Sequence, residues 1–304
     1  MTAETLDTFQ LEMGTASEVG MAIVLAVMMF AVALGLKPSN FSFFKTEPKL
    51  YLTGIAAQII GLPLLTLLIC FVLNPHPSIA LGMILIACCP GGNTSNLIAL
   101  FARANTALSV SLTATSSIFA AFITPVSILF WSSLYPPTRA LLTEINIDVV
   151  NFLTQTLVIL VLPLLIGMLF RHFAPKIATR IQTPLAIISG VALLAIIVIA
   201  SIRLFPIFIV LGVGIYFIVV AHNLLAFALG NFAARAIRAD KASRRALTIE
   251  IGIQNSGLGI VILLTQLGGV GGAGAVAGLW GVWHLIGGSG LALFWRWKDA
   301  RSNH

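Results

Sequence analysis

The chain has 304 residues, of which 59% are hydrophobic and only 9% are charged, whereas a soluble domain averages about 25% charged residues. With a mean hydropathy of +1.04, this composition excludes a water-soluble enzyme, a disordered chain and a disulfide-rich scaffold. The net charge of +7 does not indicate a nucleic-acid partner, because the basic residues form short clusters between apolar runs, which is the pattern of an integral membrane protein.

Charged residues and turn-forming segments divide the apolar sequence into nine candidate transmembrane helices. A bilayer core of roughly 30 Å needs about 20 apolar helical residues. In chain order, the nine ranges are 19–36, 50–73, 79–102, 104–138, 149–170, 181–202, 204–234, 246–266 and 275–295. A proline-rich segment at 74–78 separates the second range from the third, and a glycine-rich linker at 267–274 precedes the ninth. The range 204–234 is longer than one crossing needs, so we expect a tilted or extended helix there.

The distribution of Lys and Arg predicts the orientation of these helices. Of the 17 basic residues, all except Arg139 and Arg203 fall on one side of the alternating spans. We interpret these clusters as topology anchors on the cytoplasmic side of the cell's inner (plasma) membrane. Residues 1–18 contain four acidic residues and no basic one, so they predict an extracellular N-terminal segment rather than a signal peptide. Residues 296–304 are expected to be a cytoplasmic tail.

Two of the nine helices are interrupted by glycine and polar residues. The third contains CCPGGNTSN at 88–96, and the eighth contains TIEIGIQNSGLG at 248–259. Proline and glycine break the helical hydrogen-bond pattern, and non-helical backbone in a bilayer is tolerated only inside protein or beside a water-filled cavity. The alternative is a pair of glycine-rich packing faces, which would not require Glu250. The two interruptions therefore predict a functional site.

The positions of the interrupted helices suggest an internal duplication. If a five-helix unit is repeated, 149–295 is one complete copy and 19–138 is a copy without its first helix. The interrupted helix is then the fourth in both copies. An odd number of helices per unit inserts the two copies in opposite directions, as in secondary transporters whose broken helices meet at the substrate site. We therefore expect an all-α polytopic fold with an inverted-topology repeat and two broken, crossing helices.

Glu250 is the only acidic residue within the nine predicted spans that we place at bilayer depth. A charge there costs at least about 3 kcal/mol, so a functional role is the default interpretation. No Lys or Arg lies within any predicted span, which leaves a proton or a metal cation as its partner. Oxygen-bearing side chains nearby are Ser95, Asn96, Gln254 and, one helical turn apart, Ser109 and Thr113. Hard oxygen ligands with a single carboxylate fit sodium best.

At these positions the sequence resembles the bile acid:sodium symporter family, which includes vertebrate bile-salt carriers and bacterial and plastid organic-anion transporters. The matching pieces are 35–39 (GLKPS), 88–96, 107–109 (ALS), 222–223 (HN), 250–258 and 282–284 (VWH). The resemblance implies a panel domain of 19–36, 149–170 and 183–202. It also implies a core domain of 50–134 and 205–295, which moves against the panel.

The resemblance also implies where ligands bind. A first sodium ion is expected at Ser95, Asn96, Ser109, Thr113 and Glu250. A second is expected at Gln58 and Gln254, with the backbone carbonyls of Glu250, Ile251 and Ile253. The substrate is expected at Asn93, Thr94, Asn255 and Ser256. His284 is a further candidate, although a histidine beside tryptophan in an apolar helix usually packs, which is the interpretation we favour for it and for His222.

These expectations predict a transporter rather than an enzyme. We expect a monomer that imports an organic anion, such as a bile acid or a small carboxylate, with two sodium ions by alternating access. Helix N-termini beginning after each break would attract the anion without a basic side chain. The alternative is a proton-coupled organic-acid carrier that uses Glu250 as its proton relay. A channel or receptor is disfavoured because the polar residues are concentrated at two points, and a membrane-embedded hydrolase because Ser95 and Ser256 show no His–Asp partners.

Overall fold

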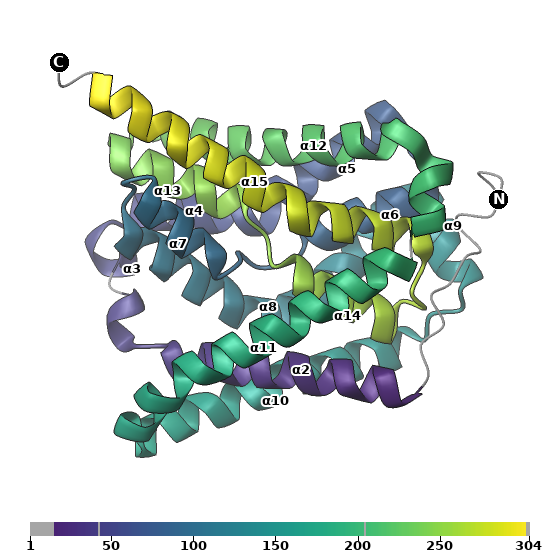
Figure 1. Ribbon diagram of the computed structural model, residues 1–304, viewed down its shortest axis with the longest axis horizontal. Helices are drawn as coiled ribbons and strands as arrows, with labels where there is room; N and C mark the ends of the chain where they lie inside the picture. Colours follow the sequence, from purple (N-terminus) through teal and green to yellow (C-terminus); the bar gives the residue numbers. More distant parts are fainter. Residues whose placement is uncertain (1–14, 42, 204, 302–304) are drawn as a thin grey trace.

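The computed structural model describes residues 15–41, 43–203 and 205–301, and these residues form a bundle of helices (Figure 1). Within them no β-strand forms, and an isolated β-bridge joins Gly91 to Gln254. Most of the expected N-terminal segment lies outside the described residues, as do the last three residues of the expected tail. The rest of the expected tail continues the last helix, α15 (Gly271–Arg301).

Seven helical spans are long and apolar enough to cross a membrane. Six are single helices: α2 (Thr15–Gly35), α8 (Thr106–Leu134), α10 (Val149–Phe173), α11 (Pro175–Arg203), α12 (Phe205–Ala236) and α15. The seventh is continuous from α4 (Pro48–Ala56) through η2 (Ala57–Gly61) to α5 (Leu62–Leu73). The expected all-helical, multi-pass membrane protein is thereby confirmed.

The two predicted spans that contain the interruptions each consist of two short helices. The first pair is α6 (Pro77–Ala87) and α7 (Thr94–Phe101), and the second pair is α13 (Lys241–Gly252) and α14 (Ser256–Gln266). In each pair the chain leaves the helix at the glycine-containing segment that stands out in the sequence. Residues of α6 and α14 are almost entirely buried, so neighbouring helices enclose the breaks.

Two long spans deviate from regular α-helix for identifiable reasons. In η2 the backbone forms a π-turn, in which the N–H of Leu62 bonds to the carbonyl of Ala57. Pro63 follows directly and has no N–H to continue the α-helical pattern. α12 is kinked at Gly212, whose φ of 56° and ψ of −148° are accessible mainly to glycine. The long helix predicted in this region is therefore bent at Gly212.

Short helices connect some of the spans, mostly in stretches for which the sequence analysis predicts no element. They are η1 (Pro38–Phe41), α3 (Phe43–Thr46) and α9 (Pro136–Glu144). The glycine-rich linker before the last span is shorter than expected, because α15 already begins at Gly271. The interrupted segments themselves lie where the sequence predicts them.

α2, α10 and α11 pack together on one side of the molecule, at the bottom of Figure 1. α10 approaches α2 closely at Gly167, where a Cβ atom would lie 2.6 Å from the Cβ of Ala33. Arg171 of α10 donates a hydrogen bond to the carbonyl of Leu34 at the end of α2. These contacts make the three helices one packed group.

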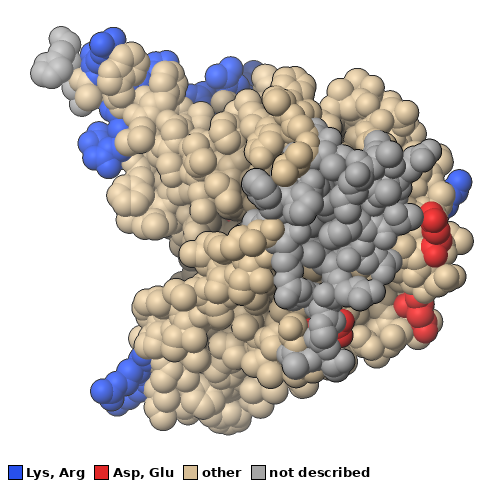
Figure 2. Space-filling model, turned by 45° about the vertical axis from the view of Figure 1, so that its right-hand side comes forward, with Lys and Arg blue, Asp and Glu red and all other residues tan. Residues whose placement is uncertain are grey.

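Charged residues lie at the two ends of the molecular surface in the space-filling view. In Figure 2 most of the visible Lys and Arg gather on the left and the visible Asp and Glu toward the right, and the described surface between them is mainly uncharged. Many large apolar side chains are exposed, for example Ile187, Ile188 and Val191 of α11. An uncharged apolar belt is the surface expected of a protein embedded in lipid.

Candidate functional site

The two interrupted segments lie side by side and run in opposite directions. The backbone N–H of Gly92 donates to the carbonyl of Ile253 at 3.0 Å, and that of Asn255 donates to the carbonyl of Pro90 at 2.8 Å. Gly91 and Gln254 form the antiparallel bridge between them. These bonds satisfy backbone groups that the broken helices leave without partners. The structure thus brings together two segments that are far apart in the sequence.

The carboxylate of Glu250 lies at this crossing and is only 2% exposed. Its Oε2 accepts hydrogen bonds from Ser95 Oγ at 2.7 Å and from Ser109 Oγ at 2.9 Å. Its Oε1 accepts from Thr113 Oγ1 at 2.6 Å. The three hydroxyls come from α7 and α8, so one carboxylate joins α13 to both helices.

Asn96 completes this group, because its Oδ1 lies 3.3 Å from Thr113 Oγ1. All five side chains predicted for the first sodium ion therefore belong to one hydrogen-bonded cluster. A hydroxyl that donates to a carboxylate keeps lone pairs that can face a cation. The cluster combines one negative charge with neutral oxygen donors.

The side chains of Gln58 and Gln254 contact each other at the crossing. Gln58 Nε2 donates to Gln254 Oε1 at 2.6 Å and to the carbonyl of Cys89 at 3.1 Å. Gln254 Nε2 donates to the carbonyl of Ile251 at 2.7 Å. The carbonyls of Ile251 and Ile253 thus each accept one hydrogen bond already, and each has a second lone pair for another partner.

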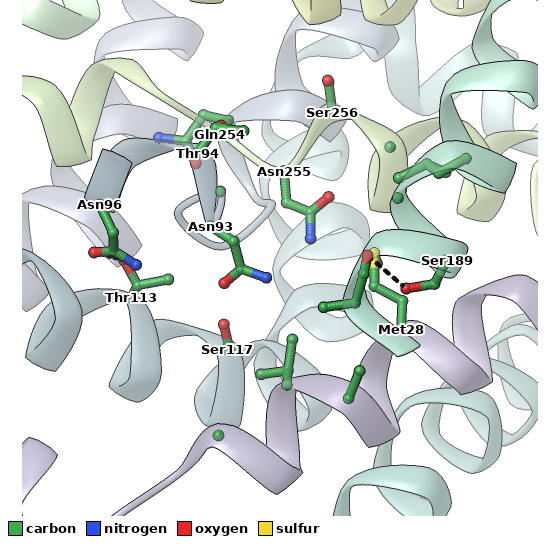
Figure 3. Close-up of a pocket in the computed structure, with 18 of the residues that line it drawn as sticks. Met28, Asn93, Thr94, Asn96, Thr113, Ser117, Ser189, Gln254, Asn255 and Ser256 are labelled. Carbon is green, nitrogen blue, oxygen red and sulfur yellow. Dashed lines mark hydrogen bonds between the residues drawn. The ribbon is translucent and has the colours of Figure 1, made fainter. Parts of the chain in front are cut away.

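A cavity of about 630 Å³ lies next to the crossing, between α2 and α11 on one side and α7, α8, α14 and α15 on the other. Its lining includes all five predicted substrate residues: Asn93, Thr94, Asn255, Ser256 and His284. In Figure 3 the amides of Asn93 and Asn255 project into the same space, which Ser117 faces from α8. The facing wall on α2 and α11 is mainly apolar, with Met28, Ala186 and Leu193.

The cavity has a polar wall without charged side chains. Among the lining residues that the structure describes, none is Lys, Arg, Asp or Glu. α7 and α14 both begin at this wall, and helix N-termini carry partial positive charge. Asn255 caps α14 by accepting a hydrogen bond from the N–H of Leu258 at 3.0 Å, whereas Asn93 makes no cap bond to α7. An anion could therefore be held by amides, hydroxyls and helix ends.

The two candidate histidines occupy different places. His222 is fully buried outside the cavity, where its Nε2 lies 2.7 Å from Thr66 Oγ1 and its ring meets Trp280 edge-on. Its packing interpretation therefore fits the structure. His284 is also buried but lines the cavity, so it stays among the candidate substrate residues.

Three contacts at the site are missing from the prediction made on the sequence. The carbonyl of Cys89 accepts from Gln58, the Oγ of Ser116 accepts from the N–H of Gly91 at 3.3 Å, and Ser117 lines the cavity. Ser116 and Ser117 lie three and four residues after Thr113, so helical spacing along α8 could have identified them. The carbonyl of Cys89 gives no signal in the sequence.

Comparisons with known proteins place the chain in a family. A sequence profile of the Sodium Bile acid symporter family matches residues 22–210. "Uncharacterized sodium-dependent transporter YocS" of Bacillus subtilis (strain 168) is 30% identical over 275 residues, which cover 90% of this chain and 82% of the Bacillus protein. "Probable sodium/metabolite cotransporter BASS1, chloroplastic" of Arabidopsis thaliana is 31% identical over 90% of this chain and 65% of the plant protein.

A human protein shows a more distant similarity. The "Ileal sodium/bile acid cotransporter" of Homo sapiens is 26% identical over 238 residues, which cover 78% of this chain and 67% of the human protein. The similarity therefore spans most of the Bacillus protein, but only about two thirds of the plant and human proteins.

Proposed function

This chain belongs to the sodium bile acid symporter family, a family of sodium-dependent transporters rather than enzymes, and we propose that it imports an organic anion by alternating access. The observation that carries the proposal is the buried carboxylate of Glu250, surrounded by hydroxyls where two broken helices cross. Sodium is the driving ion, and the anion binds in the adjacent cavity.

The ligand set supports sodium as the partner of Glu250. Ser95, Ser109, Thr113 and Asn96 offer uncharged oxygens around one carboxylate, which suits an alkali cation. Transition metals prefer His and Cys, and no group of three or more His, Cys, Asp or Glu side chains occurs in the described part of the chain. A second ion binds at Gln58 and Gln254, with the carbonyls of Glu250, Ile251 and Ile253.

Coupling follows from the shared position of the two sites. Sodium neutralises Glu250 and ties α7, α8 and α13 together, which orients the helix ends and the amides of Asn93 and Asn255 toward the anion. Each ligand then raises the affinity for the other by the same factor. Two sodium ions with a monoanion carry net positive charge inward, so the membrane potential adds to the driving force.

The packing supports a two-domain mechanism. α2, α10 and α11 form the panel, the remaining spans form the core, and the cavity lies between them. The antiparallel pairing of the two breaks supports an inverted repeat of nine spans, with the two broken pairs crossing the membrane. Alternating access then moves the core against the panel and exposes the crossing to each side in turn.

The cavity opens toward the basic end of the molecule. Its lining includes Gly35, Asn40 and Gln182, which neighbour Lys37 and Arg180 in the sequence. In Figure 2 the surface is hollowed on the left, where the visible Lys and Arg gather. Because basic residues mark the cytoplasm, the conformation is inward-facing, with the N-terminus outside and the C-terminus in the cytoplasm.

The two walls of the cavity indicate an amphipathic substrate. The anionic group binds at Asn93, Thr94, Asn255 and Ser256, beside the helix N-termini. An apolar body fits against Met28, Leu193 and other apolar side chains of α2 and α11. A bile acid or a smaller carboxylate meets both requirements.

Transport into proteoliposomes tests the proposal. A thermal-shift screen with bile salts, pantoate and keto acids, with and without sodium, first selects the anion, because ligands stabilise the folded state. Uptake of that labelled anion is then measured at fixed pH with an inward gradient of sodium or of choline. We expect uptake only with sodium. Uptake that persists in choline and follows an imposed pH gradient would instead establish the proton-coupled alternative.

Substitution of the carboxylate tests its role directly. Glu250→Gln keeps the size of the side chain but removes the charge, so we expect sodium-driven uptake to be lost. Glu144→Gln removes an exposed carboxylate at the end of α9 and serves as the control. Full sodium-dependent uptake by Glu250→Ala would refute the assignment.

A further inference from the structure

A second buried charge lies on α13, one and a half turns before Glu250. Arg245 is only 5% exposed. Its Nη1 donates to Asp299 Oδ2 and its Nη2 to Asp299 Oδ1, both at 2.8 Å, so the two side chains form a bidentate ion pair. The guanidinium also lies 5.3 Å from the centre of the Trp295 ring. These contacts join the start of α13 to the end of α15.

The same guanidinium holds the end of α7. Arg245 Nη1 donates to the carbonyl of Ala102 at 2.9 Å, directly after the last helical residue. The last carbonyls of a helix have no partners within it and form the negative end of its dipole, so a cation is favourable there. We call Arg245, Asp299, Trp295 and Ala102, with Lys241 at the rim, the Arg245 cluster.

α7 is therefore fixed to α13 at both of its ends. At the crossing, Ser95 donates to Glu250, and at the far end, Ala102 accepts from Arg245. The linker after α7 adds two bonds, from the N–H of Asn105 to the carbonyl of Ala242 at 3.0 Å and from Asn105 Nδ2 to Ser243 Oγ at 3.2 Å. α7 has only eight residues, so its far end strongly constrains its near end.

We propose that Arg245 is a positioning residue for sodium binding, which it serves by setting the separation of α7 and α13. Through α7 it holds Ser95 and Asn96 against Glu250 without touching the ion. The inference rests on the proposed function, because it assumes that the Glu250 cluster binds sodium. It assigns a specific role to a residue whose place in the sequence indicates only a topology anchor.

The Arg245 cluster contains two cations with different environments, which gives a matched control. Lys241 also pairs with Asp299, at 2.5 Å, but its side chain is 60% exposed. Exposed ion pairs contribute little, whereas removing one partner of a buried pair leaves the other charge uncompensated. Of these two cations, Arg245 is the one that also donates to the carbonyl of Ala102, directly after α7.

The test compares Arg245→Met with Lys241→Met in the sodium dependence of uptake. For Arg245→Met we expect the sodium concentration for half-maximal uptake to rise about tenfold, within the usual range of coupling between sites. At saturating sodium the ion restores the geometry, so the maximal rate per folded molecule and the KM for the anion change less than twofold. Lys241→Met should leave all three quantities unchanged.

A purely structural role would give a different result. It would lower the amount of folded protein equally at every sodium concentration and would leave the half-maximal concentration unchanged. That result, or an equal shift in Lys241→Met, would overturn the inference. Arg245→Lys keeps the charge but lacks the planar guanidinium that donates to both Asp299 and the carbonyl of Ala102. We therefore expect an intermediate rise in the sodium concentration for half-maximal uptake.

If Arg245→Met does not fold, Asp299→Asn replaces it in the test. The asparagine side chain has the same shape as that of Asp299 but no charge, and position 299 is partly exposed. For this variant we expect the sodium concentration for half-maximal uptake to rise at least threefold. The sodium concentration for half-maximal thermal stabilisation, measured without substrate, should rise by a similar factor. Failure of the proposed function is distinguishable, because wild-type protein would then show no sodium dependence. If wild type depends on sodium and none of these variants shifts, only the role of Arg245 fails.

Discussion

The carboxylate of Glu250 accepts hydrogen bonds on both of its oxygens, from three hydroxyls that belong to two different helices. Each hydroxyl contributes in two ways. It donates to the carboxylate, and its oxygen is a potential sodium ligand. Substitution of one hydroxyl should therefore weaken the proposed sodium binding without introducing a new charge.

Thr113→Val should raise the sodium concentration for half-maximal uptake by about tenfold or more. Thr113 makes the shortest of the three bonds to Glu250, and a hydrogen bond to a charged group contributes about 1.5–3 kcal/mol. Thr115→Val is the matched control, because the Thr115 hydroxyl bonds Tyr51 and the carbonyl of Ser111 instead. Sodium titrations of uptake for both variants would check this, and equal shifts would contradict it.

Gly91→Ala should abolish sodium-dependent uptake. A Cβ atom at this position would overlap Glu250 Oε1 and lie 3.2 Å from its Cδ. The backbone is held in place here by the bridge from Gly91 to Gln254 in the other interrupted segment. Gly190 of α11 also lies near the site, in the wall of the cavity, but a Cβ there meets nothing within 4 Å. Gly190→Ala should therefore transport like wild type. Normal transport by Gly91→Ala would show that the carboxylate lies elsewhere during the cycle.

Among the elements, α13 carries the buried carboxylate of Glu250 and has a side-chain cap at its start. Asp240 Oδ1 accepts from the N–H groups of Ala242 at 2.8 Å and Ser243 at 3.1 Å. Its hydrogen bond with the Ser243 side chain, together with these N–H groups, lowers the pKa of the Asp240 carboxyl below its usual value. The capping anion is thus stabilised in the folded protein.

Asp240→Ala should reduce the stability of the protein by about 1 kcal/mol, the usual effect of losing an N-cap. The pKa of Asp240 is lower in the folded protein than in the unfolded chain, so its charge stabilises the fold at any pH above the unfolded pKa. This stabilisation is lost as the pH falls through the pKa of Asp240 in the folded protein. Asp240→Asn can still cap but does not titrate, so it should lack this loss in acid. Thermal midpoints in detergent across acidic pH would measure both effects.

The whole molecule consists of a small helix group and a larger one, with the cavity between them. The small group, α2, α10 and α11, exposes many apolar side chains, whereas the breaks lie inside the large group. The proposed motion of one group against the other would therefore leave the crossing enclosed by protein on most sides. The side on which the cavity opens is testable by chemical labelling.

Val32→Cys should be labelled by a membrane-impermeant thiol reagent in inside-out vesicles and not in right-side-out vesicles. Val32 lines the cavity, which we propose opens toward the basic end of the molecule on the cytoplasmic side. Thr143→Cys, on exposed α9 at the opposite end, should show the reverse pattern. The background replaces the three buried cysteines, Cys70, Cys88 and Cys89, by serine. Labelling of Val32→Cys only from the outside would contradict the inward-facing assignment.

The polar centre is largely predictable from the sequence because its residues contrast chemically with their surroundings. Pro90, the adjacent glycines and Glu250 stand out in apolar runs, and the spacing of Ser109 and Thr113 shows that they share a helix face. Gln58 is recognisable only by resemblance to a family, and it lies in the π-turn that precedes Pro63. Local periodicity does not reveal such a turn.

Tertiary contacts explain what the sequence does not predict. Arg245 looks like any basic residue at a membrane surface, and its burial depends on Ala102 and Asp299, which lie far from it in the chain. The apolar wall of the cavity is equally hidden, because Met28 and Leu193 resemble lipid-facing residues until α2 and α11 are placed against the crossing. Residues whose role depends on distant partners are therefore the ones that need a structure.

The reciprocal bonds between the two breaks also constrain how the protein is made. The segment around Pro90 reaches the membrane first, while its partner around Asn255 is synthesised only after four more spans. Until then, the N–H of Gly92 and the carbonyl of Pro90 lack the partners that they have in the folded protein, in a medium without water. Biogenesis must therefore keep this half hydrated or shielded, and a chain truncated before α13 should be a substrate for membrane quality control.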